Sequence, residues 1–203
     1  KRDLQFFCFL FEYKIAKTEQ ILKFCYPTSS ITNVRYRLSR LKKLNFISSK
    51  GYESHRGLIK VFNLTKSGKK LIKEYYSEHI SNFKLKSETP EHDLMLIEIG
   101  KWFSKNKHTE AYLTENILQS NSYYREHQSF SHFVNIKSDA FLDLSFKGDK
   151  YKVAVEYENS QKAFKRYEKL VSEYYLSSQV DIIFYFFKDE SIKKAISKIE
   201  KNN

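Results

Sequence analysis

Residues 137–159 read KSDAFLDLSFKGDKYKVAVEYEN and predict a β-hairpin that turns at residues 148–149. Apolar and polar residues alternate on both sides of the turn, and successive side chains of a strand point to opposite faces of a sheet. A two-residue turn at this position places Asp139 opposite Glu158. One face of the hairpin is apolar or aromatic throughout, whereas the other gathers four carboxylates: Asp139, Asp143, Glu156 and Glu158.

The negative charges on the carboxylate face of this hairpin repel one another and need a compensating group. Like charges that face each other across a sheet destabilise it by a few tenths to about 1 kcal/mol. Lys152 lies nearer the turn and does not neutralise Asp139 and Glu158. A divalent cation, or a proton on one carboxyl group, relieves the repulsion. The alternative is a solvent-exposed face whose charges have no special role, although acidic residues are poor strand formers.

The segments around the hairpin predict an α/β domain over residues 90–203. The expected elements, in chain order, are a helix at 91–106, a strand at 110–118, a polar loop at 119–131, the hairpin, a helix at 160–178, a strand at 180–187 and a helix at 190–200. The run VDIIFYFF is typical of a buried parallel strand. The order α-β-β-β-α-β-α therefore favours a right-handed crossover through the helix at 160–178.

The net charge of the chain is concentrated in its first half. Residues 1–86 hold 19 Lys and Arg against 6 Asp and Glu, whereas residues 87–203 hold 17 against 18. This excess predicts a polyanionic partner, by default nucleic acid. The alternative is that the lysines only keep a small domain soluble. No apolar run approaches the roughly 18 residues that span a bilayer, so a membrane partner is not expected.

Residues 1–80 predict a winged helix-turn-helix. Helices are expected at 3–17 and at 19–25, the second capped by Thr18. Residues 30–47, SITNVRYRLSRLKKLNFI, predict a third helix whose core stripe recurs at helical spacing: Ile31, Val34, Leu38, Leu41 and Leu44. Its opposite face carries residues suited to DNA contacts: Asn33, Tyr36, Arg37, Arg40 and Lys43. In a helix-turn-helix this last helix enters the major groove, where Asn reads adenine and Arg reads guanine.

Two short strands, near 46–52 and 58–63, are expected to form a wing after this helix. Its polar tip would let Arg56 reach phosphate or the minor groove, and Thr65 is expected to cap a fourth helix. The motifs RLKKLNFI and LTKSGKKL resemble the pattern rLkkLgfI…yxLTxxGxxL of the winged-helix domains of bacterial regulators. This resemblance implies binding to double-stranded DNA. A winged helix used only for protein contacts is the alternative.

Residues 81–89 are predicted to be a linker, and Pro90 starts the next helix. The αβββαβ order, with Asp at the start of the second strand and Glu in the third, resembles the PD-(D/E)xK nuclease superfamily. More specifically, the second half resembles the replication-relaxation family, whose pattern is roughly pDa…flEiDr…K…Y. The matching residues are Ser138-Asp139-Ala140, Glu156-Tyr157-Glu158, Lys169 and Tyr174, and PEHDLMLIEIG is similar to the family's leHdlaveev helix.

This resemblance implies a catalytic site that departs from the superfamily at one position. Asp139 and Glu156 would hold Mg²⁺, with Glu98 as a weak further ligand. The usual lysine after the third-strand Glu is replaced by Glu158, which would assist catalysis. A lysine of the next helix would then position the water, and Lys162 is closest to the strand end, ahead of Lys165 and Lys169. If no lysine serves, the domain is a degenerate nuclease that needs no metal.

The leading hypothesis is therefore a DNA-binding protein of a plasmid, phage or integrative element that acts in replication, mobilisation or its control. The nuclease-like domain over 90–203 would be degenerate. One alternative is an active Mg-dependent endodeoxyribonuclease or nickase that uses Asp139 and Glu156; another is a dimeric transcriptional repressor. The expected partners are double-stranded DNA, a second copy of the chain, and other replication or mobilisation proteins. The expected location is the bacterial cytoplasm, on the nucleoid or a plasmid.

Overall fold

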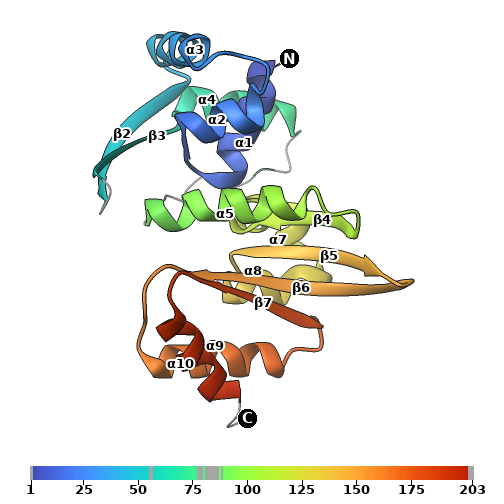
Figure 1. The fold of residues 1–203 in the computed structure, drawn as a ribbon. Coiled ribbons are helices and arrows are strands. Elements are labelled where there is room, and N and C mark those ends of the chain that lie inside the picture. Colours follow the sequence, from blue (N-terminus) through green and yellow to red (C-terminus); the bar gives the residue numbers. More distant parts are fainter. Residues whose placement is uncertain (1, 55–56, 77–79, 81–86, 88, 201–203) are drawn as a thin grey trace. The chain divides into compact units, whose positions relative to one another are not determined.

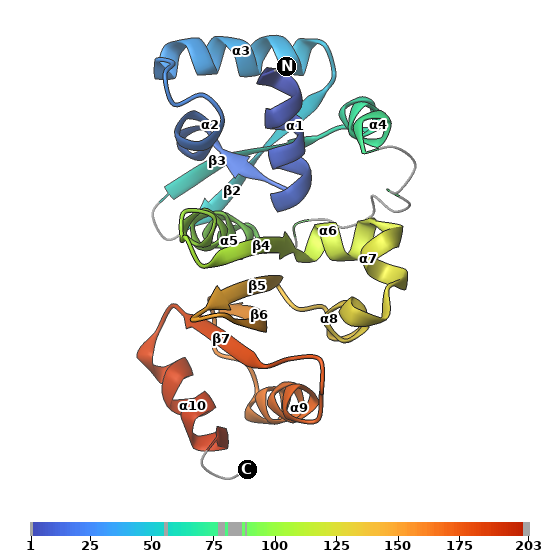
Figure 2. The same cartoon turned by 90° about the vertical axis from the view of Figure 1, so that its right-hand side faces the viewer.

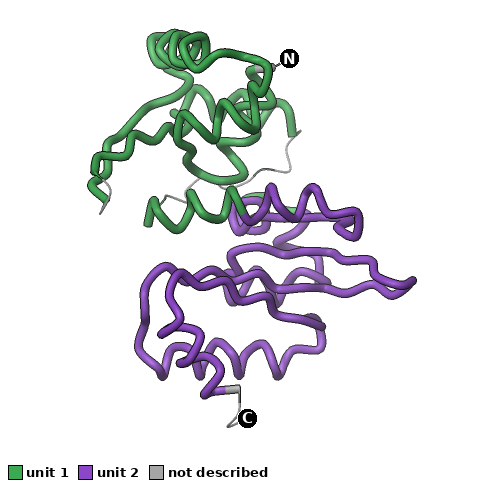
Figure 3. The backbone as a smooth tube through the Cα atoms, in the orientation of Figure 1, with its two compact units in different colours: residues 1–98, 120–122 green, residues 99–119, 123–203 purple. Residues whose placement is uncertain are grey.

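The structure, a computed structural model, describes residues 2–54, 57–76, 80, 87 and 89–200. Arg56 and most of the predicted linker at 81–89 lie outside these ranges. The described part is a mixed α/β fold with ten α-helices, a three-stranded antiparallel sheet and a four-stranded mixed sheet. None of its helices is both long and apolar enough to cross a membrane. The chain forms two compact units (Figure 3): unit 1 is residues 1–98 and 120–122, and unit 2 is residues 99–119 and 123–203.

Unit 1 consists of helices around a small sheet (Figure 1). Its elements are α1 (Arg2–Tyr13), β1 (Ala16–Lys17), α2 (Thr18–Cys25), α3 (Ile31–Lys43), β2 (Ile47–Ser54), β3 (Gly57–Leu64) and α4 (Lys66–Tyr75). The antiparallel sheet has the order β1-β3-β2. The predicted helix at 3–17 was too long, because residues 16–17 pair with β3 instead.

The two helix caps predicted for unit 1 have different outcomes. The Thr65 hydroxyl accepts a hydrogen bond from the Gly68 N–H at 3.2 Å, which confirms its predicted role as the N-cap of α4. The cap predicted at Thr18 is wrong: Thr18 is the first residue of α2, because β1 ends at the residue before it. In α3 the core stripe ends earlier than predicted, since Leu44 follows the helix and is 54 % exposed.

Gly68 allows α4 to lie against the segment between α3 and β2. A Cβ atom at this position would lie 2.2 Å from the backbone oxygen of Phe46. We expect Gly68→Ala to destabilise the protein by about 1–3 kcal/mol, because the helix must move away from a backbone atom. Urea unfolding measures the change, and Ser67→Ala, at an exposed site of the same helix, is the control. Equal stability of the two variants would contradict the close contact.

Unit 2 is a sheet flanked by helices (Figure 2). Its elements are the C-terminal part of α5 (Pro90–Phe103), β4 (Thr109–Thr114), α6 (Glu115–Ser120), α7 (Ser122–Glu126), a 3₁₀ turn (Gln128–Phe130), α8 (Ser131–Ile136), β5 (Ala140–Phe146), β6 (Asp149–Glu158), α9 (Phe164–Tyr175), β7 (Ile182–Phe187) and α10 (Glu190–Glu200). Several predicted bounds were wrong here, and the helix expected at 160–178 begins only at Phe164. The strand expected at 110–118 ends at Thr114, and the expected loop at 119–131 contains short helices.

The four strands of unit 2 lie in the order β4-β5-β6-β7. Strand β7 is parallel to its neighbour β6, across α9, which confirms the predicted parallel strand. The prediction that this strand is buried was wrong, because β7 lies at the edge of the sheet and its residues are only partly buried. The hairpin turns at Lys147 and Gly148, whose φ angles are 55° and 93°, one residue earlier than predicted. Positive φ at both central residues suits the right-handed twist of a hairpin, and here a lysine adopts it. The predicted register was wrong by two residues, which leaves every side chain on its predicted face.

Helices cover both faces of this sheet. On the apolar face, Phe103 of α5 stacks on Phe184 with ring centres 5.9 Å apart. On the carboxylate face, Phe141 and Ala154 pack with residues of α6, α8 and α9: Leu118, Phe133 and Tyr174. The carboxylate face is therefore covered at the end that carries Glu156 and Glu158, which are only 7 % and 3 % exposed, whereas Asp143 nearer the turn is partly exposed.

Candidate functional site

The exposed side of α3 is the first candidate site. The five predicted DNA-contacting residues of this helix are all exposed: Asn33, Tyr36, Arg37, Arg40 and Lys43. Tyr36 is 73 % exposed, whereas Val34 and Leu38 on the opposite side are buried. The helical period therefore presents a basic face to solvent, as predicted for residues that share one side of a helix.

One flank of α3 is neutralised by a carboxylate of α1. Both Asp3 oxygens accept hydrogen bonds from the Arg37 guanidinium. The Tyr26 hydroxyl donates to Asp3 Oδ1 at 3.0 Å, and the Arg37 guanidinium carbon lies 5.9 Å from the centre of the Tyr26 ring. Burial, followed by the Asp3 charge, raises the pKa of Tyr26, so its hydroxyl stays a donor. The exposed Arg37 guanidinium therefore already has a carboxylate partner, Asp3, within unit 1.

The other flank of α3 lines a basic groove that the sequence analysis missed. The groove has a volume of about 660 Å³, and its polar and charged lining comes from α3, β3 and the segment around the start of α2: Lys17, Thr18, Glu19, Arg35, Ser39, Lys42 and Lys60. Arg35 and Lys42 are two helical turns apart, a spacing visible in the sequence. Lys17 and Lys60 join them because the short strand β1 pairs with β3.

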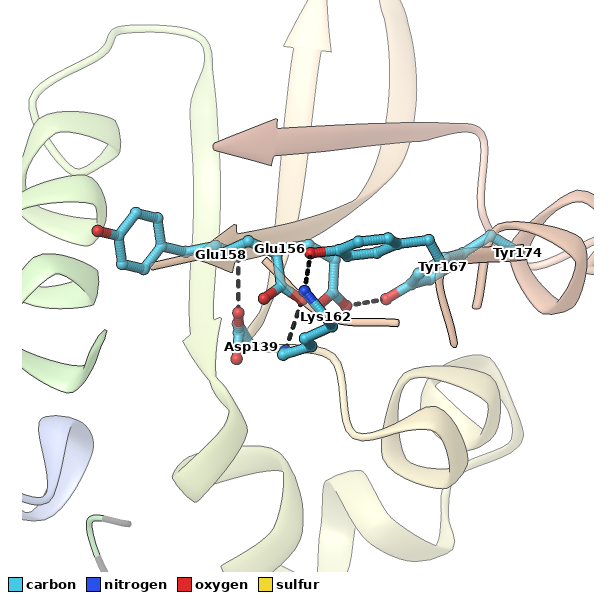
Figure 4. A network of polar contacts seen from close by, with 7 residues as sticks. Asp139, Glu156, Glu158, Lys162, Tyr167 and Tyr174 are labelled. Carbon is cyan, nitrogen blue, oxygen red and sulfur yellow. Dashed lines mark hydrogen bonds and ion pairs between the residues drawn. The ribbon is translucent and has the colours of Figure 1, made fainter. Parts of the chain in front are cut away.

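The second candidate site is the carboxylate cluster of unit 2 (Figure 4). Glu156 and Glu158 project from the end of β6, and Asp139 precedes β5. Tyr174 of α9 donates a hydrogen bond to Glu156 Oε1, and its hydroxyl lies 2.6 Å from Ser138 Oγ. Asp139 Oδ2 accepts a hydrogen bond from the Tyr157 N–H at 2.8 Å. Of the residues matched by the family resemblance, those at 138–139 and 156–157 and Tyr174 thus meet in one network, whereas Lys169 is exposed outside it.

Lys162 supplies the positive charge of this cluster. Its side-chain Nζ lies 2.6 Å from Glu158 Oε1, and its backbone N–H donates a hydrogen bond to the Tyr167 hydroxyl at 2.9 Å (Figure 4). The predicted helical position of Lys162 is wrong, since it lies in the segment before α9. Of the other lysines considered, Lys165 is exposed, and Lys169 is 78 % exposed beside Glu173. Lys162 is therefore the lysine that the fold brings to the carboxylates.

Burial governs the electrostatics of the cluster. It raises the pKa of Glu156 well above its usual range, and the Asp139 charge adds to this, while the Tyr174 hydrogen bond acts in the opposite direction. Burial and the Glu156 charge likewise raise the pKa values of Tyr174 and Tyr185. A buried carboxyl group beside a second carboxylate favours the neutral acid, because burial and a like charge both disfavour ionisation. We infer that Glu156 retains its proton at a pH where an exposed glutamate has lost it.

These residues do not fit a divalent metal ion. Mg²⁺ binds free carboxylate oxygens and retains several waters, whereas Glu156 Oε1 accepts a hydrogen bond from Tyr174 and Glu158 Oε1 is paired with Lys162. Glu98, the predicted weak ligand, lies in unit 1, where it accepts hydrogen bonds from Gln20 at 3.1 Å and Lys23 at 2.7 Å. Among the described residues, no group of three or more His, Cys, Asp or Glu side chains is arranged to hold a metal.

Two tyrosines of the cluster carried no signal in the sequence. The Tyr167 hydroxyl joins the network by accepting a hydrogen bond from the backbone N–H of Lys162, which lies in the segment before α9. Tyr185 pairs in register with Glu156 on the neighbouring strand. Neither position is marked by a motif, because both depend on how α9 and β7 pack on β6.

Comparisons of the chain with protein-family models, with curated proteins and with solved structures find no match.

Proposed function

We propose that the chain is a DNA-binding protein of a plasmid, phage or integrative element, acting in replication, mobilisation or its control. Unit 1 would dock on duplex DNA as a winged helix, and unit 2 would be a degenerate PD-(D/E)xK-like domain. The observation that carries this proposal is the exposed, cationic α3 with a basic groove on one flank. Such a surface suits phosphate neutralisation, the main source of affinity for DNA.

The order of elements in unit 1 supports the docking mode. The order of three helices followed by the β2-β3 hairpin, with α3 as the last helix before the hairpin, supports a winged helix. The α3 helix would enter the major groove with Asn33, Tyr36 and Arg40 near base edges. The exposure of these three side chains supports this role.

The carboxylate cluster supports a degenerate rather than a working nuclease site. Catalysis of this type needs ionised carboxylates that hold a metal and a lysine free to act on water. Here Glu156 favours the neutral acid, and Lys162 is engaged by Glu158. One observation favours the alternative, an active endodeoxyribonuclease: Glu158 Oε2 is buried without a hydrogen-bond partner among the described residues, so the cluster has unused acceptor capacity.

Two assays on the full chain test the proposed function. We expect a fluorescent duplex to bind with an affinity that falls as salt rises, since bound phosphates release counterions. We expect supercoiled plasmid to remain uncut with Mg²⁺ or Mn²⁺. Cleavage by the parent protein but not by Asp139→Ala would instead establish the endonuclease. Failure to bind any duplex at low salt would overturn DNA binding itself.

A further inference from the structure

The two flanks of α3 differ in how their positive charges are compensated. On one flank, both oxygens of Asp3 bind Arg37. On the other, four cations line the groove: Lys17, Arg35, Lys42 and Lys60. Glu19 is the one carboxylate in this lining, and none of the four cations forms an ion pair with any described residue. The groove therefore keeps a local excess of positive charge.

A cluster with four cations and one carboxylate repels itself in the free protein and is stabilised by a polyanion, even though Lys17 also helps to lower the pKa of Glu98. The rest of the lining suits a nucleic-acid strand. The Ser39 and Thr18 hydroxyls can donate to phosphate oxygens. Leu58, which is 75 % exposed, and Ile59 add an apolar wall against which sugar can pack.

We propose that this groove binds the sugar–phosphate backbone of one strand of duplex DNA, so that the Arg35–Ser39–Lys42 side of α3, not the Arg37 side, faces the backbone. This inference rests on the proposed function and extends it by assigning the orientation of α3. The phosphate groups would lie between α3 and β3, close to Lys42 and Lys60. On the Arg37 side, Asp3 would repel an approaching phosphate and already occupies the guanidinium.

The test compares two double variants with the same loss of charge. Arg35→Gln/Lys42→Gln removes two groove cations, and Lys66→Gln/Lys73→Gln removes two exposed cations of α4 as the control. Binding of two unrelated labelled duplexes is followed by fluorescence anisotropy over a range of NaCl concentrations. Each lost phosphate contact should lower the salt slope by about one and the affinity by about 10-fold near 0.1 M salt. The groove variant should thus lose about 100-fold on both duplexes, because backbone contacts carry no sequence preference.

Single variants refine the assignment and guard against a folding defect. Lys60→Gln, in the β3 wall of the groove, should lower the salt slope by about one, and Lys42→Gln should cost more affinity than Arg37→Gln. Thermal melting of each variant checks that unit 1 stays folded. An equal or larger loss from Arg37→Gln, or a loss confined to one duplex, would overturn the proposed orientation.

The outcomes separate this inference from the function on which it rests. If the parent protein binds duplex DNA and the groove variant binds like the control, the groove assignment fails while DNA binding stands. If the parent protein binds single-stranded nucleic acid and no duplex, both the duplex function and the groove assignment fail. A loss specific to the groove variant, equal on both duplexes, supports the assignment.

Discussion

Replacing Lys162 by methionine is expected to destabilise unit 2 by about 3 kcal/mol, the lower end of the cost of breaking a buried ion pair. The partner, Glu158, is 3 % exposed, and the Lys162 side chain is 30 % exposed, so solvent screens the pair only from one side. Methionine keeps most of the aliphatic stem and removes the ammonium group. Glu158 would then be buried with neither carboxylate oxygen bonded to a cation, since its Oε2 has no hydrogen-bond partner within the described residues.

Urea unfolding followed by tryptophan fluorescence measures this loss. The single tryptophan, Trp102, lies in unit 2 with its ring centre 4.8 Å from that of Phe103. Lys169→Met is the matched control, since its exposed pair with Glu173 should contribute less than about 0.5 kcal/mol. Adding Glu158→Gln to Lys162→Met should restore part of the stability, because the buried charge is then absent. Equal effects of the two lysine variants would mean that Glu158 is compensated by another group.

The local signals of unit 1 predicted much of its structure. Helix α3 follows from its apolar stripe, and the cap at Thr65 follows from the residue type and its place before a helical run. The short strand β1 was missed, because two residues carry no detectable alternation. The partner of Arg37 was missed as well, since Asp3 lies 34 residues away and only the packing of α1 brings it there. The basic groove was missed for the same reason, because it forms only where segments far apart in the sequence pack together.

In unit 2 the sequence predicted the faces of the hairpin but not its register. Alternation determines which side chains share a face, whereas the register depends on the turn, and here Lys147 adopts a left-handed conformation that the sequence did not signal. The carboxylates and Lys162 were predicted as one site, largely from the family resemblance. Their burial was not predicted in detail, because the covering helices α6 and α8 are too short to show a helical period.

Replacing Glu156 by glutamine is expected to stabilise unit 2 increasingly as pH rises above the pKa of an exposed glutamate, and to have little effect at acid pH. The folded-state pKa of Glu156 is raised, by burial first and by the Asp139 charge second, above the ordinary value of 4.5 that the unfolded chain has. The folded protein therefore keeps a proton that the unfolded chain releases. The stability that this proton contributes is complete below the unfolded pKa and is lost as pH rises toward the folded pKa, by up to about 1.4 kcal/mol per pH unit.

Glutamine removes this pH dependence because its amide is neutral at every pH, while its oxygen can still accept the Tyr174 hydrogen bond. Urea unfolding monitored at Trp102, at several pH values between about 4 and 8, should show the variant gaining on the parent protein as pH rises. Glu168→Gln, at an exposed site of α9, is the control for the loss of one carboxyl group. A Glu156→Gln variant that instead loses stability as pH rises would mean that the folded protein uses Glu156 as a carboxylate. The cluster would then again suit a cation, and the nuclease alternative would gain over the degenerate site.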